Sequence, residues 1–432
     1  MNLGATTSSA PARGMRDFMP AEVALRDWAT SKILAVYQKF GFTRIETPAV
    51  ENIAQLRRGE GGENLQLIFE ILKRGDKLDK VLSGQPLDKD ELADLGLRFD
   101  LTVPLVRFYS ANQSNLPNPF KAIQIGSVWR AESPQQGRYR QFTQCDIDTF
   151  GIKTEFAEME LIEATSEALL SLGFESFTIH LNDRRVLSAL AESCGFESSR
   201  HDNVFIQIDK LDKIGIAGVE KELSENGHAP SAVAAIVERL KLFQGRDLKA
   251  SNIQELVGDN CPSEVVTGLT KVIEGIRAVS QGKYAIVFDP TLVRGMGYYT
   301  GQIFEIKVDG YSSSVGGGGR YDKMVGKMTG RDVPGVGFSI GFERIISILL
   351  EKNVKPEASD AKIAIIYDPD RDQISAVFES AKKLRDSGNL VSVLPRRKEM
   401  RKQIDALVQQ GFTEYASFRS EGELDLKPLK SS

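Results

Sequence analysis

The 432-residue sequence is poor in cysteine and in histidine, with three residues of each. Cys145, Cys194 and Cys261 are scattered and odd in number, which excludes a disulfide framework and is typical of buried thiols in a reducing compartment. No cysteine or histidine spacing matches a zinc site. We therefore expect a cytoplasmic protein without zinc.

Long apolar runs are also missing. No stretch approaches the roughly 20 apolar residues that span a bilayer, and the N-terminal residues MNLGATTSSAPA lack the apolar core of a signal peptide, so no membrane partner is expected. The net charge of −4 and the hydrophobic content of 41% are typical of a globular protein and do not by themselves indicate a nucleic-acid partner. One basic run could contact a polyanion, although a solvated helix face is its simpler interpretation. This run consists of Arg396, Arg397, Lys398, Arg401 and Lys402.

The apolar pattern divides the chain into domains. Several strand-like runs precede a helix near residue 154 without regular alternation of strand and helix, which predicts an antiparallel sheet with helices packed on it. Amphipathic helices, including Pro230–Phe243 and Ser263–Ser280, then fill a segment without catalytic-looking residues. The C-terminal segment alternates strand and helix, as a small α/β domain does. The predicted fold is α+β, with a catalytic domain at 1–174 and 284–354, a mainly helical insertion at 175–283 and a C-terminal α/β domain at 361–432.

The densest functional signal is SVWRAESPQQGRYRQFTQCDIDTFG, in which a polar loop flanked by arginines such as Arg130 precedes a strand-like run. Alternate residues of a strand project from the same face. Gln144, Asp146 and Asp148 therefore share one face beside the arginines. This arrangement indicates a site for a cation next to a polyanion; arginines that serve only solubility are the alternative.

Two further segments carry polar groups. In RFDLTVP, Asp100 and Thr102 are predicted to project together from a strand, although any half-exposed strand shows such alternation. In LVRGMGYYTGQIFEI, Arg294 lies beside glycines that allow backbone to approach a ligand, and Tyr298 and Tyr299 offer hydroxyl groups on rigid rings.

Four consecutive glycines, Gly316 to Gly319, argue against an ordinary strand interior, because glycine weakens strands and marks close backbone approach. A flexible loop is the plainer interpretation of such a run. Further glycines lead to Arg344 at a predicted helix start, which favours a strand and helix that face a ligand. Neither the Walker phosphate-binding pattern nor a dinucleotide-binding GxGxxG after a buried strand occurs.

All three histidines, His180, His201 and His228, fall in the predicted insertion. No Ser-His-Asp or Cys-His arrangement can be assembled around the motifs, so the chemistry should need no histidine base. Attack of an already ionised carboxylate on the α-phosphate of ATP meets that condition, because it relies on positioning and on arginines or Mg²⁺ that neutralise developing charge.

These clusters, in this order, resemble the class II aminoacyl-tRNA synthetases, and specifically the histidyl family. FGFTRIETPAVE resembles motif 1 of that class, VWRAE with GRYRQF resembles motif 2, and GVGFSIGFERI resembles motif 3. GRYRQFTQCDIDTFG and LVRGMGYYTG with GGGGRYD resemble the histidine-binding signatures of the family. The class I signatures HIGH and KMSKS are absent.

The resemblance implies an enzyme that activates L-histidine with ATP to histidyl-adenylate, releases pyrophosphate, and transfers histidine to the 3' end of tRNA(His). It implies that Arg294 and Arg130 are catalytic, and that Arg130, Glu132 and Arg344 hold ATP together with Mg²⁺. The residues that it assigns to histidine are Asp100, Thr102 and Gln144 for the α-amino group, Asp148 and Tyr299 for the imidazole, and Tyr298 and Tyr321 for the pocket wall.

The resemblance also implies partners. Motif 1, with Pro48 at its kink, implies a homodimer, and the C-terminal domain resembles a trimmed anticodon-binding domain. On that analogy the start of the basic run, Arg396, Arg397 and Lys398, would contact tRNA, as would Gln135 in the motif 2 loop.

Two positions depart from the family pattern. Gly297 stands where the family often has aspartate, which affects one hydrogen bond of the histidine signature, and Ser133 stands where many bacterial members carry an arginine that reads the tRNA acceptor end. Two other functions share the core: a synthetase-like regulatory subunit of histidine biosynthesis, and a non-catalytic RNA-binding or kinase-regulating relative. Arg130, Arg294 and Arg344 are all present together with the α/β tail, which favours the enzyme over the regulatory subunit. The lack of an additional flanking domain favours the enzyme over the non-catalytic relative.

Overall fold

The computed structural model divides into two compact units, Met1–Val354 and Lys355–Ser432, and each is described by itself. The residues that it describes are 9–58, 66–84, 89–133, 139–243, 249, 253–257, 260–294, 297–311, 313–356, 361–419 and 424–429.

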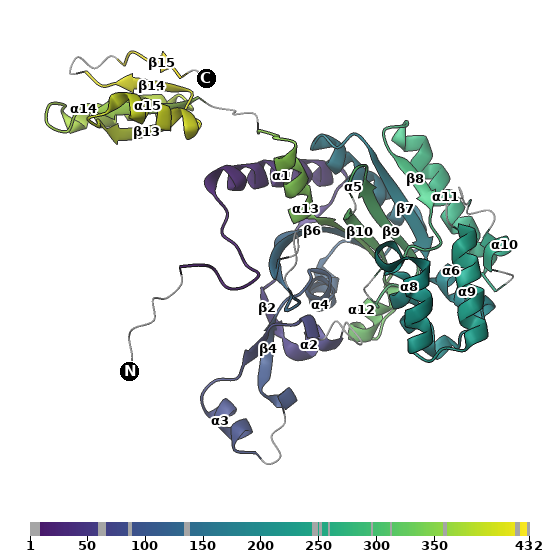
Figure 1. The fold of residues 1–432 in the computed structure, drawn as a ribbon. Coiled ribbons are helices and arrows are strands. Elements are labelled where there is room, and N and C mark those ends of the chain that lie inside the picture. The colour runs from purple at the N-terminus through teal and green to yellow at the C-terminus, as the bar shows by residue number, and fades with distance from the viewer. Residues whose placement is uncertain are drawn as a thin grey trace. The chain divides into compact units, whose positions relative to one another are not determined.

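An eight-stranded sheet forms the centre of the first unit (Figure 1). Its inner strands are antiparallel, and only the two edge pairs, β1 with β5 and β7 with β8, run parallel. The predicted α+β fold with an antiparallel sheet is therefore confirmed. In sheet order the strands are β1 (Thr43–Arg44), β5 (Phe120–Trp129), β6 (Gln141–Phe150), β11 (Gly335–Gly341), β10 (Ser314–Arg320), β9 (Gln302–Val308), β7 (Phe177–Asp183) and β8 (Ala285–Phe288).

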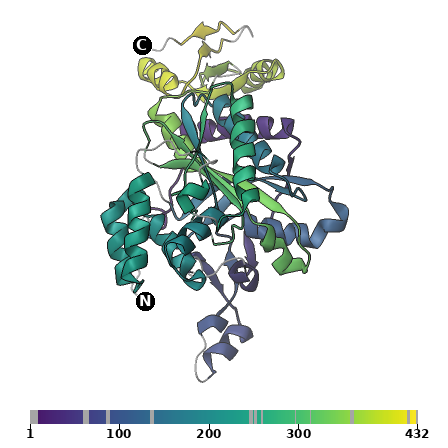
Figure 2. The same ribbon diagram turned by 90° about the vertical axis from the view of Figure 1, so that its right-hand side faces the viewer.

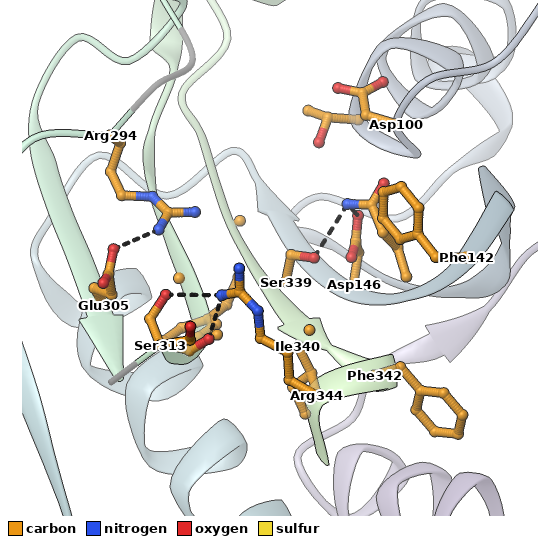
Figure 3. Close-up of a pocket in the computed structure, with 18 of the residues that line it drawn as sticks. Asp100, Phe142, Asp146, Arg294, Glu305, Ser313, Ser339, Ile340, Phe342 and Arg344 are labelled. Atoms are coloured by element: carbon orange, nitrogen blue, oxygen red, sulfur yellow. Dashed lines mark hydrogen bonds and ion pairs between the residues drawn. The ribbon is translucent and has the colours of Figure 1, made fainter. Parts of the chain in front are cut away.

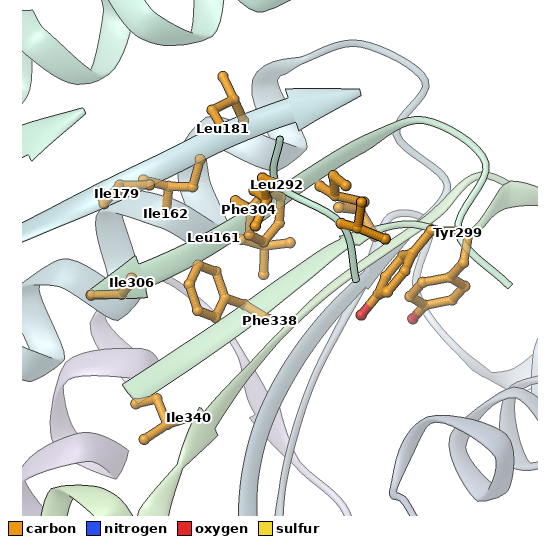
Figure 4. Packing of buried hydrophobic residues seen from close by; sticks show 14 of the residues in the cluster. Leu161, Ile162, Ile179, Leu181, Leu292, Tyr299, Phe304, Ile306, Phe338 and Ile340 are labelled. Atoms are coloured by element: carbon orange, nitrogen blue, oxygen red, sulfur yellow. The ribbon is translucent and has the colours of Figure 1, made fainter. Parts of the chain in front are cut away.

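Helices cover the apolar face of this sheet. α5 (Phe156–Ser171) contacts β6 and β11, α1 (Pro20–Lys39) packs on α5, and α13 (Phe342–Glu351) contacts β6 and β10. Leu161 and Ile162 of α5 lie among apolar side chains of three strands, including Phe304 and Phe338, whose rings stack at 4.8 Å (Figure 4). Burial of these side chains stabilises the packing of the sheet on α5 by about 25 cal/mol per Å² of apolar surface. The other face of the sheet is left for polar groups.

Most of the helices between β7 and β8 stand beside the sheet (Figures 1 and 2), whereas α11 packs on β7, β8 and α5. The segment predicted as a helical insertion begins differently from the expectation, because β7 lies inside it and pairs with β9 of the main sheet. Ile179 and Leu181 of β7 alternate into the core, which is the pattern of a strand buried on one face. The helices are α6 (Arg184–Ser193), α7 (His201–Ile208), α8 (Leu211–Glu225), α9 (Pro230–Phe243), α10 (Ile253–Val257) and α11 (Ser263–Ser280).

A small sheet, β2-β4-β3, lies at the end of the unit and corrects one prediction. RFDLTVP is not a strand: β4 ends at Leu97, and a helix begins at Thr102. Asp100 Oδ1 accepts the Val103 N–H at 3.1 Å, so the aspartate satisfies a free donor of the first helical turn. The sequence TRIETPAV, which reads as a strand, is not one strand either: its first residues form β1 of the main sheet and its last residue begins β2 of the small sheet. The elements here are β2 (Val50–Asn52), α2 (Ile53–Arg58), β3 (Glu70–Leu72), α3 (Asp76–Leu82), β4 (Ala93–Leu97), α4 (Thr102–Asn112) and α12 (Asp322–Thr329), and short 3-10 turns occupy Lys89–Glu91, Gln113–Asn115 and, before α7, Ser198–Arg200.

The second unit is a four-stranded sheet of order β13-β12-β14-β15 with a helix on each face. Alternate residues of β12 build two small cores, Ala364 and Ile366 against Leu407, and Ile365 against Val377. The basic residues Arg396 to Lys398 are exposed between β13 and α15. The elements are β12 (Lys362–Tyr367), α14 (Ile374–Asp386), β13 (Leu390–Pro395), α15 (Met400–Gln409), β14 (Glu414–Ser417) and β15 (Lys427–Pro428). Across the described residues of both units, the helices are too short or too polar to cross a membrane.

A buried ion pair ties α5 to β10, and its removal tests the packing of the first unit. Glu158, 1% exposed, accepts two hydrogen bonds of 2.6 Å from Arg320. We predict that Glu158→Ala lowers the free energy of unfolding by ~3–5 kcal/mol. The variant removes the buried carboxylate that takes two hydrogen bonds from Arg320 and leaves the guanidinium only Asp322, at 3.2 Å, as a charged partner. Urea denaturation measures the loss. Glu225→Ala, which removes an exposed pair with Lys221, is the control and should change stability by ~0–1 kcal/mol; equal losses would contradict the interpretation.

Candidate active site

A cavity of about 620 Å³ lies on the polar face of the main sheet. It is built from the start of α4, the facing strands β6, β9, β10 and β11, the residues that follow β5, and the start of α13. Eleven of the predicted site residues line it: Asp100, Thr102, Arg130, Glu132, Gln144, Asp148, Arg294, Tyr298, Tyr299, Tyr321 and Arg344. Gln135 lies outside the described residues, and Arg396, Arg397 and Lys398 belong to the second unit.

Carboxylates gather on one side of the cavity. Asp146 and Asp148 project into it from β6 and are 3% and 2% exposed, while Cys145 and Ile147 of the same strand point into the core. Asp100 joins them from the turn before α4 and is 1% exposed. Burial raises the pKa of Asp148 to about 7 and that of Asp100 to about 6, because a low-dielectric environment disfavours the charged form. Burial, and then the charge of Asp148, also raises the pKa of Asp146.

Tyrosine rings close this side of the cavity. The Tyr321 hydroxyl donates to Asp148 Oδ1 at 2.5 Å, and the Tyr298 ring lies 4.8 Å from that of Tyr299 and 5.8 Å from that of Tyr321. Gly337 of β11 makes room for the carboxylate, because a Cβ there would lie 2.0 Å from Asp148 Oδ1. The result is a small pocket with a carboxylate at its base and aromatic walls.

The guanidinium groups of Arg294 and Arg344 lie across the cavity from Asp100 (Figure 3). Arg130 instead lies near the carboxylates, and its positive charge acts to lower the pKa of Asp100 and of Asp146, against the larger effect of burial. Arg294 donates to Glu305 of β9 at 2.8 Å, and Arg344 donates to the backbone oxygen of Ser314 at the start of β10. Arg130 donates to the backbone oxygen of Phe99 at 3.1 Å and stacks over the Phe142 ring. Each arginine is thus held in place by the framework, and a guanidinium can bind a phosphate through two parallel hydrogen bonds.

The glycine run forms a central strand rather than a loop. Gly316 to Gly319 lie within β10 and pair with both β9 and β11. A Cβ at Gly317 would lie 2.5 Å from the Arg294 guanidinium, and one at Gly318 would lie 2.0 Å from the Gly337 carbonyl oxygen. The close approach that the glycines predicted is therefore present, and it gives Arg294 its place over the sheet.

Several residues of the cavity were not predicted from the sequence. Glu305 and Lys307 share the polar face of β9, which the alternation in QIFEIKV could have shown. Asp209 and Asp212, from the ends of α7 and α8, also line the cavity, and Asp212 binds Lys307 at 2.9 Å. Nothing in the local sequence could have indicated these two, because only the tertiary fold brings the helical segment to the sheet.

No described histidine lines the cavity. His180 lies on β7 of the main sheet, not among the helices, and its Nδ1 is 2.9 Å from Asp289. The described residues contain no cluster of three or more histidine, cysteine or acidic side chains that could hold a metal ion. The arrangement can instead bind a cationic group at the carboxylates and a polyanion at the guanidinium groups.

An antiparallel sheet backed by helices, with arginines from the β5–β6 connection and from the start of α13 in one cavity, defines the catalytic domain of a class II aminoacyl-tRNA synthetase. The family model for histidyl-tRNA synthetase matches residues 14–345. The histidine–tRNA ligase of Leifsonia xyli subsp. xyli is 43% identical over 97% of this chain and 98% of its own length. A probable histidine–tRNA ligase of Tropheryma whipplei is 40% identical over 93% of this chain and 94% of its own.

The crystal structure of histidyl-tRNA synthetase from Nostoc sp. PCC 7120 has a TM-score of 0.76 and 26% sequence identity to this chain, and the match covers 98% of this chain and 97% of that one. The chain belongs to the histidyl-tRNA synthetase family.

The buried carboxylates give the site a testable pH dependence. The folded-state pKa of Asp148, about 7, lies above the ordinary value of about 3.9. Its contribution to stability is therefore present in full below about pH 4 and is lost as the pH rises through about 7. We predict that Asp148→Asn, which cannot titrate, gains on the order of 2–3 kcal/mol relative to wild type between about pH 5 and pH 8.

Urea denaturation of both proteins across this range measures the difference. Asp309→Asn, at an exposed turn, is the control for loss of a carboxylate. A constant difference between wild type and Asp148→Asn at all pH values would contradict the prediction.

Proposed function

We propose that this chain is a histidine–tRNA ligase that activates L-histidine with ATP to histidyl-adenylate and transfers histidine to the 3' end of tRNA(His). Its membership of the family supports this function. The single observation that carries the proposal is the convergence of buried carboxylates and guanidinium groups in one cavity.

The carboxylate side would hold histidine. Asp100, Thr102 and Gln144 would bind the α-amino group, and Asp148 and Tyr299 would bind the two imidazole nitrogens. A site with buried polar partners rejects an amino acid that leaves them unpaired, by factors of about 10⁴ or more. Tyr298 and Tyr321 would form the pocket wall.

The guanidinium side would hold ATP. Arg130, Glu132 and Arg344 would bind the nucleotide, and Arg294 would contact the α-phosphate. An oxygen of the histidine carboxylate attacks the α-phosphorus, the bond to the bridging oxygen of the β-phosphate breaks, and pyrophosphate leaves with the electron pair. The attacking group is already ionised, so no base is needed. Attack of a terminal hydroxyl of the tRNA on the activated carbonyl then forms the ester and releases AMP and a proton.

Arg294 and Arg130 would be the catalytic residues. A guanidinium fixed beside the α-phosphate stabilises charge as it develops and needs little reorganisation. Glu305 would keep Arg294 in place, because it binds the guanidinium at 2.8 Å from the neighbouring strand.

Magnesium would enter with the nucleotide. Mg²⁺ is usually bound through one or two carboxylates plus substrate phosphates, which fits a cavity whose described residues offer no cluster of three metal-binding side chains. Its chemistry here would be to neutralise phosphate charge during the attack. We propose no zinc.

The second unit would bind tRNA. Its α/β sheet resembles an anticodon-binding domain, and the exposed residues Arg396, Arg397 and Lys398 are its candidate contacts. Gln135 of the motif 2 loop is the candidate contact for the acceptor end. We further propose a cytoplasmic homodimer that pairs through the motif 1 region.

Histidine-dependent exchange between ATP and radioactive pyrophosphate tests the function. The proposal requires exchange that depends on histidine and then esterification of tRNA(His). Histidine binding without exchange would contradict it, and would identify instead a regulatory subunit that binds histidine but does not activate it.

The role of Arg294 can be tested separately. We predict that Arg294→Ala lowers the rate of adenylate formation by about 10² or more while histidine affinity changes little, as expected for a contact made in the transition state. Gly317→Ala should act in the same direction, because its Cβ would displace the guanidinium. Single-turnover kinetics and equilibrium binding of histidine are the measurements. Equal losses in rate and in histidine affinity would show that Arg294 is structural.

The role proposed for Asp148 predicts a loss of histidine binding rather than of adenylate formation. Asp148→Ala should weaken histidine binding by about 10²-fold, because it removes a charge-assisted hydrogen bond and leaves the Tyr321 hydroxyl unpaired. ATP binding should change little. Calorimetric titration of each ligand measures the two affinities, and equal weakening of both would refute the assignment.

A further inference from the structure

Asp146 is the buried carboxylate of the cavity that the proposed function leaves without a role. It lies on β6 between Gln144 and Asp148, on the face that lines the cavity. Its side chain is 3% exposed. A carboxylate buried this deeply is costly unless a cation or several donors satisfy it.

Three acceptor oxygens on this side of the cavity are buried and have no hydrogen-bond partner in the described part of the chain: Asp100 Oδ2, Gln144 Oε1 and Asp146 Oδ1. The Gln144 amide is oriented by its nitrogen, which donates to Ser339 Oγ at 3.2 Å and lies 3.4 Å from Asp146 Oδ2 (Figure 3). Its oxygen is therefore the atom left for a ligand. Asp100 and Asp146 are close enough for the charge of one to raise the pKa of the other.

The chemistry of these three atoms matches one substrate group. An ammonium group carries three N–H donors and no acceptor, so it can donate to acceptors such as these, and Thr102 can share one of the donors. The Thr102 hydroxyl differs from them, because it can donate as well as accept and does not depend on the ammonium group. A cation between two carboxylates also offsets the repulsion between them.

We propose that Asp146 is the third acceptor for the α-ammonium group of the substrate, beside Asp100 and Gln144, and a determinant of specificity for amino acids over amine-free analogues. The inference rests on the proposed function, because it names a further group that holds the substrate of the same site.

A structural role for Asp146 is the competing explanation. Its charge acts on Arg98, which crosses the sheet beside Gly126. The guanidinium of Arg98 is already held by backbone oxygens, with hydrogen bonds of 2.6 Å to Thr47 and 2.9 Å to Ser127. If Asp146 served only to balance Arg98, its loss would lower stability without regard to the ligand.

The experiment compares two ligands on one pair of proteins. Histidine and imidazolepropionate, which is histidine without its amino group, are titrated calorimetrically into full-length wild type and Asp146→Asn. We expect the dissociation constant for histidine to rise about 10–100-fold, as for a hydrogen bond to a charged group, while that for imidazolepropionate changes less than about twofold. Asp309→Asn is the control for charge removal outside the cavity, and should leave both constants unchanged.

Equal weakening of the two ligands, or unchanged histidine affinity, would overturn the proposal. If Asp146→Asn fails to fold, as a thermal melt would show, Asp146→Glu keeps the charge but moves the carboxylate. That variant should still lose histidine selectively, and equal losses for both ligands would again overturn the proposal. Pyrophosphate exchange by wild type is measured in parallel: its absence refutes the ligase function, whereas exchange without selective loss in the variants refutes only the role of Asp146.

Discussion

The structure of the site depends on opposite charges that are kept apart within one cavity. The framework holds the arginines through other groups, because Arg294 binds Glu305 and Arg130 donates to the backbone. The charge of Arg130 still acts to lower the pKa of Asp100 and Asp146, but burial outweighs it. Asp100 Oδ2 and Asp146 Oδ1 are buried acceptor atoms without a hydrogen-bond partner among the described residues. Such groups destabilise the folded state until a cationic ligand arrives. The rest of the sheet, its apolar backing and the Glu158–Arg320 pair have to outweigh that penalty.

Glycine makes the separation possible. An inner strand normally fills the space above it with side chains, yet the middle of β10 has none, and Arg294 lies where a Cβ of Gly317 would be. Gly337 on β11 does the same for Asp148. The cavity is thus formed by missing side chains in two neighbouring strands, while both strands keep their backbone pairing. The two strands stay rigid because their backbone hydrogen bonds need no side chains, and the missing side chains leave space above them for a ligand.

Sequence periodicity predicted the strands and helices whose apolar residues repeat regularly along the chain. The long strand β6 and the helices α9 and α11 follow from patterns of period two and about 3.6, and the face of β6 that carries the acids follows from the same alternation. Short segments were less certain: DLTVP alternates like a strand but begins α4, because Asp100 can serve the helix start. The strand β7 was hidden among helices, and the contribution of Asp209 and Asp212 depends on a tertiary contact that leaves no local signal.

The pKa shifts of the acids connect stability with recognition. With pKa values raised to about 6 for Asp100 and about 7 for Asp148, protons compete with the substrate for the same oxygens near neutral pH. A ligand with an ammonium group replaces those protons and removes the repulsion among the carboxylates, whereas a neutral ligand of the same shape leaves the repulsion in place. The site therefore distinguishes an amino acid from an amine-free ligand by the difference in their electrostatic binding energy, and not by shape alone. A site that was already neutral, with each carboxylate paired to an arginine, would be more stable and less able to distinguish an amino acid from its analogues.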